Sequence, residues 1–225
     1  MPGRSSAKNH CGRCRMYHPI CLCSLIPQFV LSTRIVVLMH WRENNLTTGT
    51  ANLACLALPN SQILLRGLQG NPLSTAGLVP NEGSAALLFP SPDSQELSPE
   101  IARGLPRPLT LIVPDGSWGQ ARKVALREPA LRHLPRFRLP PGPLSEYRLR
   151  HSPHPEGLST FEAITRALAI LEQERGAEMQ PELEHLFRTM VERRLWSKGK
   201  LRPEDCRTGI PKEALQASHR AGAGH

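Results

Sequence analysis

The most restrictive feature of the sequence is an alternation of short apolar runs with amphipathic helical patterns. One apolar run, at 34–40, is rich in β-branched side chains, and similar short apolar runs lie at 63–65, 85–89 and 109–113. The helical patterns lie between or after them, at 50–58, 117–127, 160–173 and 181–196. Continuously apolar strands that alternate with helices predict an α/β fold, with a mostly parallel sheet and helices on both faces.

This alternation also divides the chain. We expect one α/β domain at 31–202, a small Cys-rich module at 1–30 and a polar, disordered tail at 203–225. The longest strongly apolar run, 35–39, falls far short of the 18 or more residues that a membrane-spanning helix needs. We therefore expect a cytoplasmic protein with no membrane partner. The oligomeric state stays open.

Basic residues are concentrated in one part of the chain. The sequence holds 28 basic and 19 acidic side chains, a net charge of +9. Segment 103–150 alone has ten basic and three acidic residues, which gives +7 of that total. Guanidinium groups donate paired hydrogen bonds to phosphate, so this excess favours a nucleic-acid partner. The alternative is a solvated basic face, and the ten aromatic residues offer few platforms for base stacking.

Four of the six cysteines fall within thirteen residues, at Cys11, Cys14, Cys21 and Cys23. Thiolates in a reducing compartment select zinc, or less often an iron–sulfur cluster. Four protein ligands leave no open position for a substrate, so we expect a structural site. Disulfides or a redox pair at Cys11 and Cys14 are the alternatives, and His10 or His18 could replace a thiol.

In parallel sheets, ligands bind beyond the carboxyl ends of the strands. The first such stretch holds a cluster of small polar residues, Thr47, Thr48, Gly49 and Thr50. This cluster opens a predicted helix, whose free amides could hold a carboxylate or a phosphate. Capping of the helix by Thr48 or Thr50 is an equal alternative.

A second stretch follows the run at 109–113 and begins at Asp115. Ser117 and Gln120 match a capping box, which predicts that a helix starts at Ser117. The helix dipole would keep Asp115 ionised and able to accept a proton. Gly116 permits close backbone approach, and Trp118 offers an aromatic face to a cation or a base. Alternatively, Asp115 only caps the turn and Trp118 lies in the core.

A third stretch joins two arginines to another helix start. Arg148 and Arg150 alternate on one side of an extended segment and are either phosphate contacts or surface charges. Ser159 and Glu162 again match a capping box around Thr160, which explains these residues without a ligand.

Asp115-Gly116-Ser117-Trp118, followed by Gln120-Ala121-Arg122-Lys123, resembles the signature of the DTW-domain family, the tRNA-uridine aminocarboxypropyltransferases. Four further blocks follow the family's order: the cysteine cluster, 40–54, 147–150 and 159–163. The resemblance covers about residues 11–196. One departure is Ser117, where the family usually has threonine; both side chains carry the hydroxyl.

The resemblance implies a fold related to the SPOUT methyltransferases, with a knotted C-terminal region that binds S-adenosylmethionine. It also implies transfer of the 3-amino-3-carboxypropyl group of S-adenosylmethionine to the ring imide nitrogen of a tRNA uridine, in the variable loop for bacterial members. Methylthioadenosine is released. A SPOUT-type RNA methyltransferase and a non-catalytic, zinc-containing RNA-binding module are the alternatives.

On this interpretation each group of residues has an expected role. Asp115 is the general base, with Ser117 and Trp118 beside it. The expected contacts to S-adenosylmethionine are Thr47, Thr48, Gly49, Thr50, Asp115, Gly116, Ser159, Thr160 and Glu162. The expected RNA contacts are Arg122, Lys123, Arg148 and Arg150.

Overall fold

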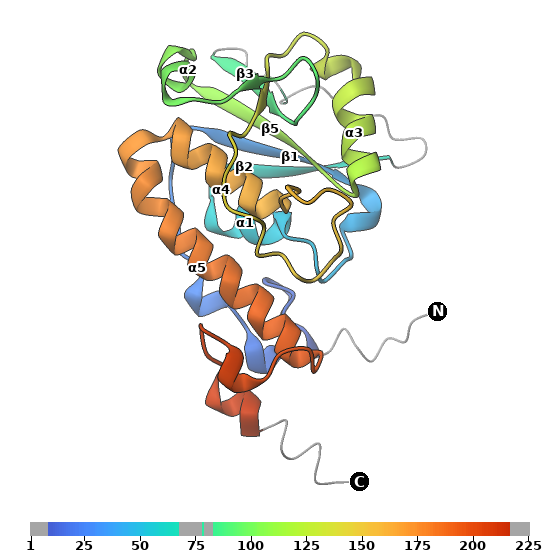
Figure 1. The fold of residues 1–225 in the computed structure, drawn as a ribbon, viewed down its shortest axis with the longest axis vertical. Coiled ribbons are helices and arrows are strands. Elements are labelled where there is room, and N and C mark those ends of the chain that lie inside the picture. The colour runs from blue at the N-terminus through green and yellow to red at the C-terminus, as the bar shows by residue number, and fades with distance from the viewer. Residues whose placement is uncertain (1–8, 68–77, 79–82, 217–225) are drawn as a thin grey trace. The chain divides into compact units, whose positions relative to one another are not determined.

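A computed structural model describes residues 9–67, 78 and 83–216 (Figure 1). The chain forms two compact units. The larger unit comprises Pro27–Ser145 and Ser152–Glu184, and the smaller unit comprises Met1–Ile26, Glu146–His151 and His185–His225. Among the described residues, no helix is both long and apolar enough to span a bilayer.

The larger unit contains a six-stranded sheet in the order β2-β1-β5-β3-β6-β4. The strands are β1 (Arg34–His40), β2 (Ser61–Arg66), β3 (Ser84–Leu88), β4 (Gln95–Glu96), β5 (Leu109–Asp115) and β6 (Arg136–Arg138). Every neighbouring pair is parallel, which confirms the predicted parallel sheet. The sequence did not predict β4 or β6, because both are short and carry almost no apolar side chains.

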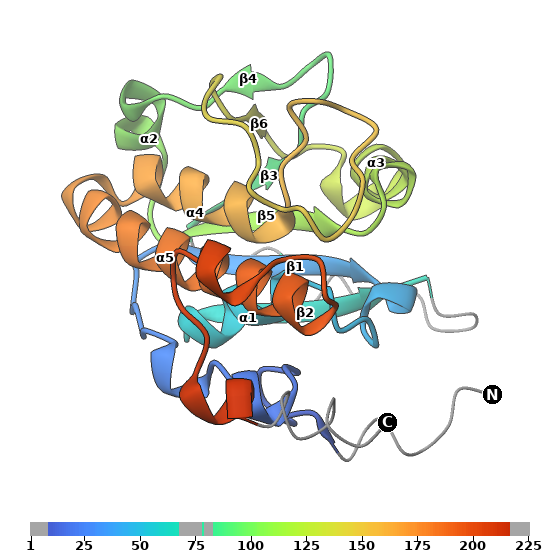
Figure 2. The same cartoon turned by 60° about the horizontal axis from the view of Figure 1, so that its bottom comes forward.

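Helices cover both faces of this sheet. The helices of the larger unit are α1 (Ala51–Ala57), α2 (Pro99–Gly104), α3 (Trp118–Arg127) and α4 (Thr160–Leu171). A further helix, α5 (Gln173–Ser197), begins in the larger unit and ends in the smaller one. Val36 and Leu38 of β1 share a buried cluster with Val124 and Ala125 of α3. Side chains alternate along a strand, so Ile35 and Val37 point to the opposite face. On that face α4 packs against β5 and α1 (Figure 2).

The predicted helix at 181–196 begins earlier than expected. Gln173 has a φ of +52°, and this left-handed residue ends α4 and turns the chain directly into α5. Pro181 lies inside α5, where it removes one backbone hydrogen bond. Met179 and Leu183, on either side of it, are almost fully buried. Their packing holds the helix together across the proline.

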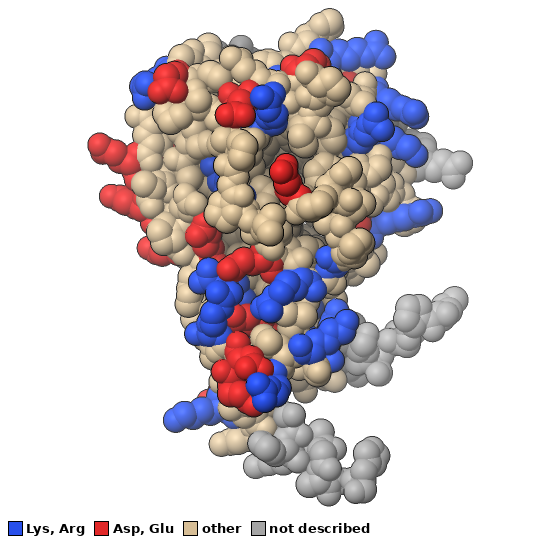
Figure 3. Space-filling model, in the orientation of Figure 1, with Lys and Arg blue, Asp and Glu red and all other residues tan. Residues whose placement is uncertain are grey.

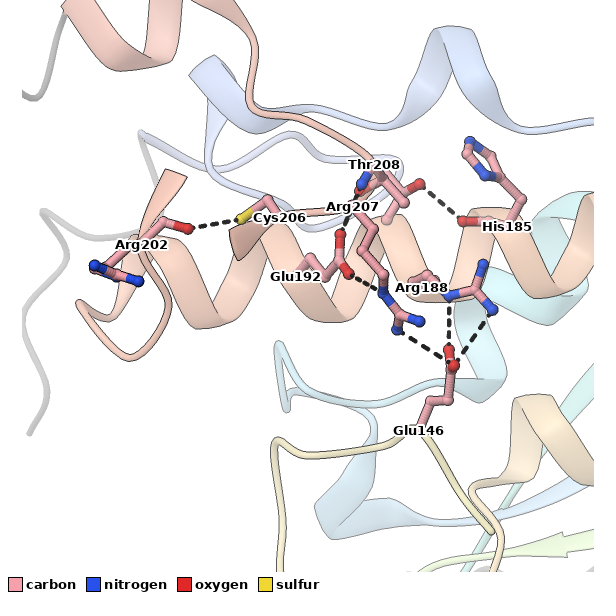
Figure 4. A network of polar contacts seen from close by, with 9 residues as sticks. Glu146, His185, Arg188, Glu192, Arg202, Cys206, Arg207 and Thr208 are labelled. Carbon is pink, nitrogen blue, oxygen red and sulfur yellow. Dashed lines mark hydrogen bonds and ion pairs between the residues drawn. The ribbon is translucent and has the colours of Figure 1, made fainter. Parts of the chain in front are cut away.

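In the smaller unit, the C-terminal segment is tied down through Thr208 (Figure 4). The buried Glu192 carboxylate accepts hydrogen bonds from the Thr208 amide at 2.9 Å, the Thr208 hydroxyl at 2.8 Å and Arg207 Nε at 3.2 Å. Glu146 pairs with Arg188 at 2.9 Å and with Arg207 at 3.3 Å. The expected disordered tail therefore does not apply to 203–208, and residues 217–225 lie outside the described part. The knot stays a prediction.

Candidate functional site

The connections after β1 and β5 place the candidate site. These two strands are neighbours in the sheet, and Met39 pairs with Asp115. The chain leaves β1 toward α1, on the α4 side of the sheet, and leaves β5 toward α3, on the other side. Open α/β sheets bind ligands at such a reversal, outside the carboxyl ends of the strands. Figure 3 shows a hollow over the region where Figure 1 draws the N-terminal end of α4.

Asp115, the last residue of β5, lies at this reversal and is 7 % exposed. Its Oδ1 accepts a 2.5 Å hydrogen bond from the hydroxyl of Thr160, the first residue of α4. The next amide, that of Phe161, donates to the Thr50 hydroxyl at 3.3 Å. The N-terminal turns of α3 and α4 thus both lie beside the carboxyl group. Their dipoles favour negative charge there, either on Asp115 or on an anionic ligand.

A capping box starts α3, as the sequence predicts. The Ser117 amide donates to Gln120 Oε1 at 2.8 Å, and the Gln120 amide donates to the Ser117 hydroxyl at 3.4 Å. The other end of the Gln120 amide, Nε2, lies 3.3 Å from His40 Nδ1. A Cβ atom on Gly116 would lie 2.9 Å from Gln120 Cβ and 3.4 Å from His40 Cβ. The lack of a Cβ atom at Gly116 therefore lets the backbone lie close to the side chains of Gln120 and His40.

Sequence reasoning did not select His40 or Gln120 as site residues. His40 Nδ1 also accepts from the Arg42 amide at 3.3 Å, which assigns the proton of the neutral ring to Nε2. Burial and the nearby Arg42 charge lower the pKa of His40, so the ring is neutral at pH 7. The position of His40 at the end of β1 is the signal that could have found it.

Trp118 is half-buried, with a large part of its ring engaged in packing. The ring lies edge-on to His154, with centroids 4.7 Å apart, and tilted against Phe89 at 6.3 Å. A Cβ atom on Gly157 would come within 3.1 Å of the Trp118 ring. His154 lies in an irregular loop without periodicity, so sequence patterns gave no sign of this contact.

The second capping box also forms, at Ser159 and Glu162. Glu162 Oε2 accepts from the Ser159 amide at 2.9 Å and from the Ser145 hydroxyl at 2.7 Å. This carboxylate therefore fixes the loop before α4 as well as the helix start.

Thr50 occupies the N-cap position of α1, but its hydroxyl does not cap that helix. The hydroxyl accepts from Phe161 of α4 instead. Within the preceding turn, the Gly49 amide donates to the Leu46 carbonyl at 3.1 Å. Thr47 and Thr48 precede Gly49 in the connection between β1 and α1.

The four clustered cysteines fit a metal ion. The sulfur atoms of Cys11, Cys14, Cys21 and Cys23 all lie within 4.8 Å of one another. The Cys11–Cys23 and Cys14–Cys21 sulfur distances are both 3.5 Å. A tetrahedron with zinc–sulfur bonds of about 2.3 Å has edges of about 3.8 Å, close to these values. Backbone amides of Cys14 and Arg13 lower the pKa of Cys11 to about 6, whereas burial raises the pKa of Cys14 and of Cys23.

The basic run at 103–150 is divided between the two units and is partly ion-paired. Four of its arginines make ion pairs with acidic residues in the larger unit: Arg103 with Glu100, Arg107 with Glu172, Arg136 with Asp93 and Arg138 with Glu96. Arg122 and Lys123 are exposed on α3 in the larger unit. Arg148 and Arg150 belong to the smaller unit.

Comparison with known proteins gives one consistent family. A sequence model of the DTW domain matches residues 8–195. The chain is 32 % identical over 171 residues to tRNA-uridine aminocarboxypropyltransferase 2 of Drosophila melanogaster, covering 73 % of this chain and 67 % of that protein. The protein of the same name from Macaca fascicularis is 29 % identical over 171 residues, covering 72 % of this chain. The chain spans 56 % of the length of this Macaca relative.

A search of solved structures gives a distant likeness. The SAM-dependent rRNA:acp-transferase Tsr3 from Vulcanisaeta distributa is 20 % identical, with a TM-score of 0.40. The likeness covers 85 % of this chain and 99 % of the Tsr3 chain.

Proposed function

The chain belongs to the DTW-domain family, and from that membership we propose that it is a tRNA-uridine aminocarboxypropyltransferase. The donor would be S-adenosylmethionine, and the acceptor the ring imide nitrogen of a uridine, which we place in the variable loop. Relatives that carry this enzyme name cover most of the chain. The observation that carries the proposal is the Asp115 carboxyl group at the strand reversal, held by Thr160 beside two helix N-termini.

Asp115 would act as the general base. The imide proton of uracil is weakly acidic, and a nearby carboxylate can accept it as the nitrogen attacks. The new bond forms between that nitrogen and the carbon of the aminocarboxypropyl group attached to sulfur. The carbon–sulfur bond breaks, and its electron pair stays on sulfur, which leaves as the neutral thioether of methylthioadenosine. Because the sulfonium is already activated, the enzyme mainly supplies geometry.

The neighbouring residues would hold the two substrates. We assign the donor's amino-acid end to the turn of Thr47, Thr48, Gly49 and Thr50 and to the α4 start at Ser159, Thr160 and Glu162. Gly116 keeps the turn after Asp115 narrow, and the hydroxyl of Ser117 contributes by fixing α3. The part of the Trp118 ring that is not packed would contact the sulfonium or stack on the uracil.

The remaining predicted residues would serve the tRNA. Zinc held by the four cysteines would be structural, because four thiolates complete its coordination. Arg122 and Lys123 on the larger unit, and Arg148 and Arg150 on the smaller unit, would contact phosphates. Folded RNA is recognised mainly by shape and backbone, and charged contacts of this kind suit that task.

One incubation tests the reaction. The protein is mixed with undermodified tRNA and S-adenosylmethionine, and mass spectrometry identifies the nucleoside and the by-product. We expect aminocarboxypropyluridine with methylthioadenosine, whereas a methylated base with S-adenosylhomocysteine would show a methyltransferase instead. Failure of S-adenosylmethionine to bind or to raise the melting temperature would support a non-catalytic module.

Asp115→Asn is the matched variant, since it keeps the size of the side chain and removes the base. It should abolish turnover while tRNA binding stays close to wild type. Retained activity would remove Asp115 from this role.

A further inference from the structure

The exposed side of α3 carries positive charge from Arg122 to the C-terminal end of the helix. Arg122, Lys123 and Arg127 are exposed, together with Gly119 and Leu126. These positions follow the spacing i, i+3, i+4, i+7 and i+8, so they lie on one face of the helix. The strip continues past the helix end through the exposed Arg132 and His133. Figure 3 shows Lys and Arg side chains gathered over α3.

No acidic side chain offsets this strip from within its own segment. The only carboxylate between Gly116 and Arg138 is Glu128, which is buried and pairs with Arg66 at 2.5 Å. Among the described residues, Arg122, Lys123, Arg127 and Arg132 form no ion pair. Lys123 and Arg127 are also like charges four residues apart, an arrangement that destabilises a helix by a few tenths of a kcal/mol. In the larger unit the four other arginines of the basic run are all ion-paired, so the unpaired charge of the run in that unit is concentrated here.

The helix that carries the strip starts at the candidate site. Trp118, the first residue of α3, follows Asp115 by three positions, and Ser117 caps the helix. Ten residues of helix extend about 15 Å from that end. A nucleotide held at Asp115 would therefore have the adjoining strand of its own chain within reach of the strip.

We propose that the strip formed by Arg122, Lys123, Arg127 and Arg132 is a docking surface for the RNA phosphate backbone next to the modified nucleotide. The nature of the RNA rests on the proposed function, but the surface itself does not. Arginine predominates, and Leu126 is the one large apolar side chain on the helix's exposed face, which fits phosphate contact better than insertion into a membrane.

The test is a salt titration of tRNA binding without S-adenosylmethionine. The variant is the triple change Arg122→Gln, Lys123→Gln and Arg127→Gln, which retains good helix formers. The control removes three exposed charges elsewhere: Arg103→Gln, Arg175→Gln and Arg202→Gln. Both variants lower the net charge equally, so a difference between them reports position. Melting temperatures check that both are folded.

Three lost phosphate contacts should reduce the slope of log K against log salt by about 2 to 3. Between 50 and 200 mM salt, wild-type affinity would then fall about 30-fold more than that of the triple variant. The control should keep the wild-type slope. Equal slopes in the control and the triple variant would overturn the proposal. The proposal would also be overturned if the three residues were needed for binding to vesicles of phosphatidylserine and phosphatidylcholine but not for binding to tRNA.

Turnover separates this proposal from the proposed function. If the chain transfers the group, the triple variant should raise KM for tRNA far more than it lowers kcat. If wild-type protein binds tRNA through the strip but modifies no uridine, the docking surface stands and the proposed reaction falls. If turnover is intact and the strip variant binds like the control, the reaction stands and the surface falls.

Discussion

Replacing Thr160 by valine isolates the contact that orients the candidate base. Valine has nearly the shape of threonine but no hydroxyl, so the 2.5 Å hydrogen bond to Asp115 Oδ1 is lost. Hydrogen bonds to charged groups contribute about 1.5 to 3 kcal/mol. Because Asp115 is only 7 % exposed, water replaces the Thr160 hydroxyl poorly as a donor. The ionised form of Asp115 therefore loses most of this hydrogen-bond free energy.

A free energy of about 1.4 kcal/mol corresponds to one pH unit of protonation. The carboxyl group of the Thr160→Val variant should therefore keep its proton to a higher pH. The acid limb of the kcat/KM profile for tRNA modification should move upward by about one to two pH units. The profile is measured between pH 5 and about 9 on protein shown to be folded by its melting curve.

Thr160→Ser is the matched control, since serine restores the hydroxyl and loses only a methyl group. It should return the acid limb close to the wild-type position. An unchanged limb in the valine variant, or equal shifts in the serine and valine variants, would refute the reasoning. A uniform loss of activity at every pH would show that Thr160 only holds the start of α4 in place.

Three further outcomes follow from the structure. Purified protein should contain about one zinc per chain, and Cys14→Ser should lower both zinc content and melting temperature; a fully stable, metal-free preparation would exclude a structural zinc site. Gly116→Ala should lower the melting temperature and turnover, because its Cβ would lie 2.9 Å from Gln120 Cβ; wild-type behaviour would show that the turn relaxes freely. Burial opposes ionisation of Glu192, but the hydrogen bonds from Thr208 and Arg207 outweigh burial and lower the pKa of this carboxyl group. The ionised Glu192 side chain therefore stabilises the fold at neutral pH, and this stabilisation is lost as the pH falls below about 4.5. The difference in melting temperature between wild type and Glu192→Gln should shrink over that acid range, and a constant difference would contradict this.

Local chemistry was sufficient for several parts of the fold. The run at 34–40 is a strand with the expected bounds, and both capping boxes form where their serines predicted. The clustering of four thiols was also readable, because short spacers bring such residues together in any compact chain. These features depend on neighbours within a few residues, and the sequence displays those neighbours directly.

Structural features that depend on residues distant in the sequence could not be predicted from the sequence in the same way. Gln173 ends α4 with a left-handed conformation, and buried Met179 and Leu183 carry α5 across Pro181. Periodicity predicts that the helix starts at Pro181, because the sequence shows the missing backbone N–H of proline but not the packing of Met179 and Leu183 that offsets its loss.

The sequence by itself determined the parallel α/β sheet, the cysteine cluster and the position of Asp115 at a strand end. Only the tertiary structure decided that Thr160, 45 residues further along the chain, binds that carboxyl group. It also decided that His40 lies beside Gln120, and that within the larger unit the basic run divides into ion-paired arginines and an unpaired strip on and just after α3. The physical reason is range: propensities and caps act over a few residues, whereas hydrogen bonds and ion pairs across a sheet form only after the strands have fixed their order.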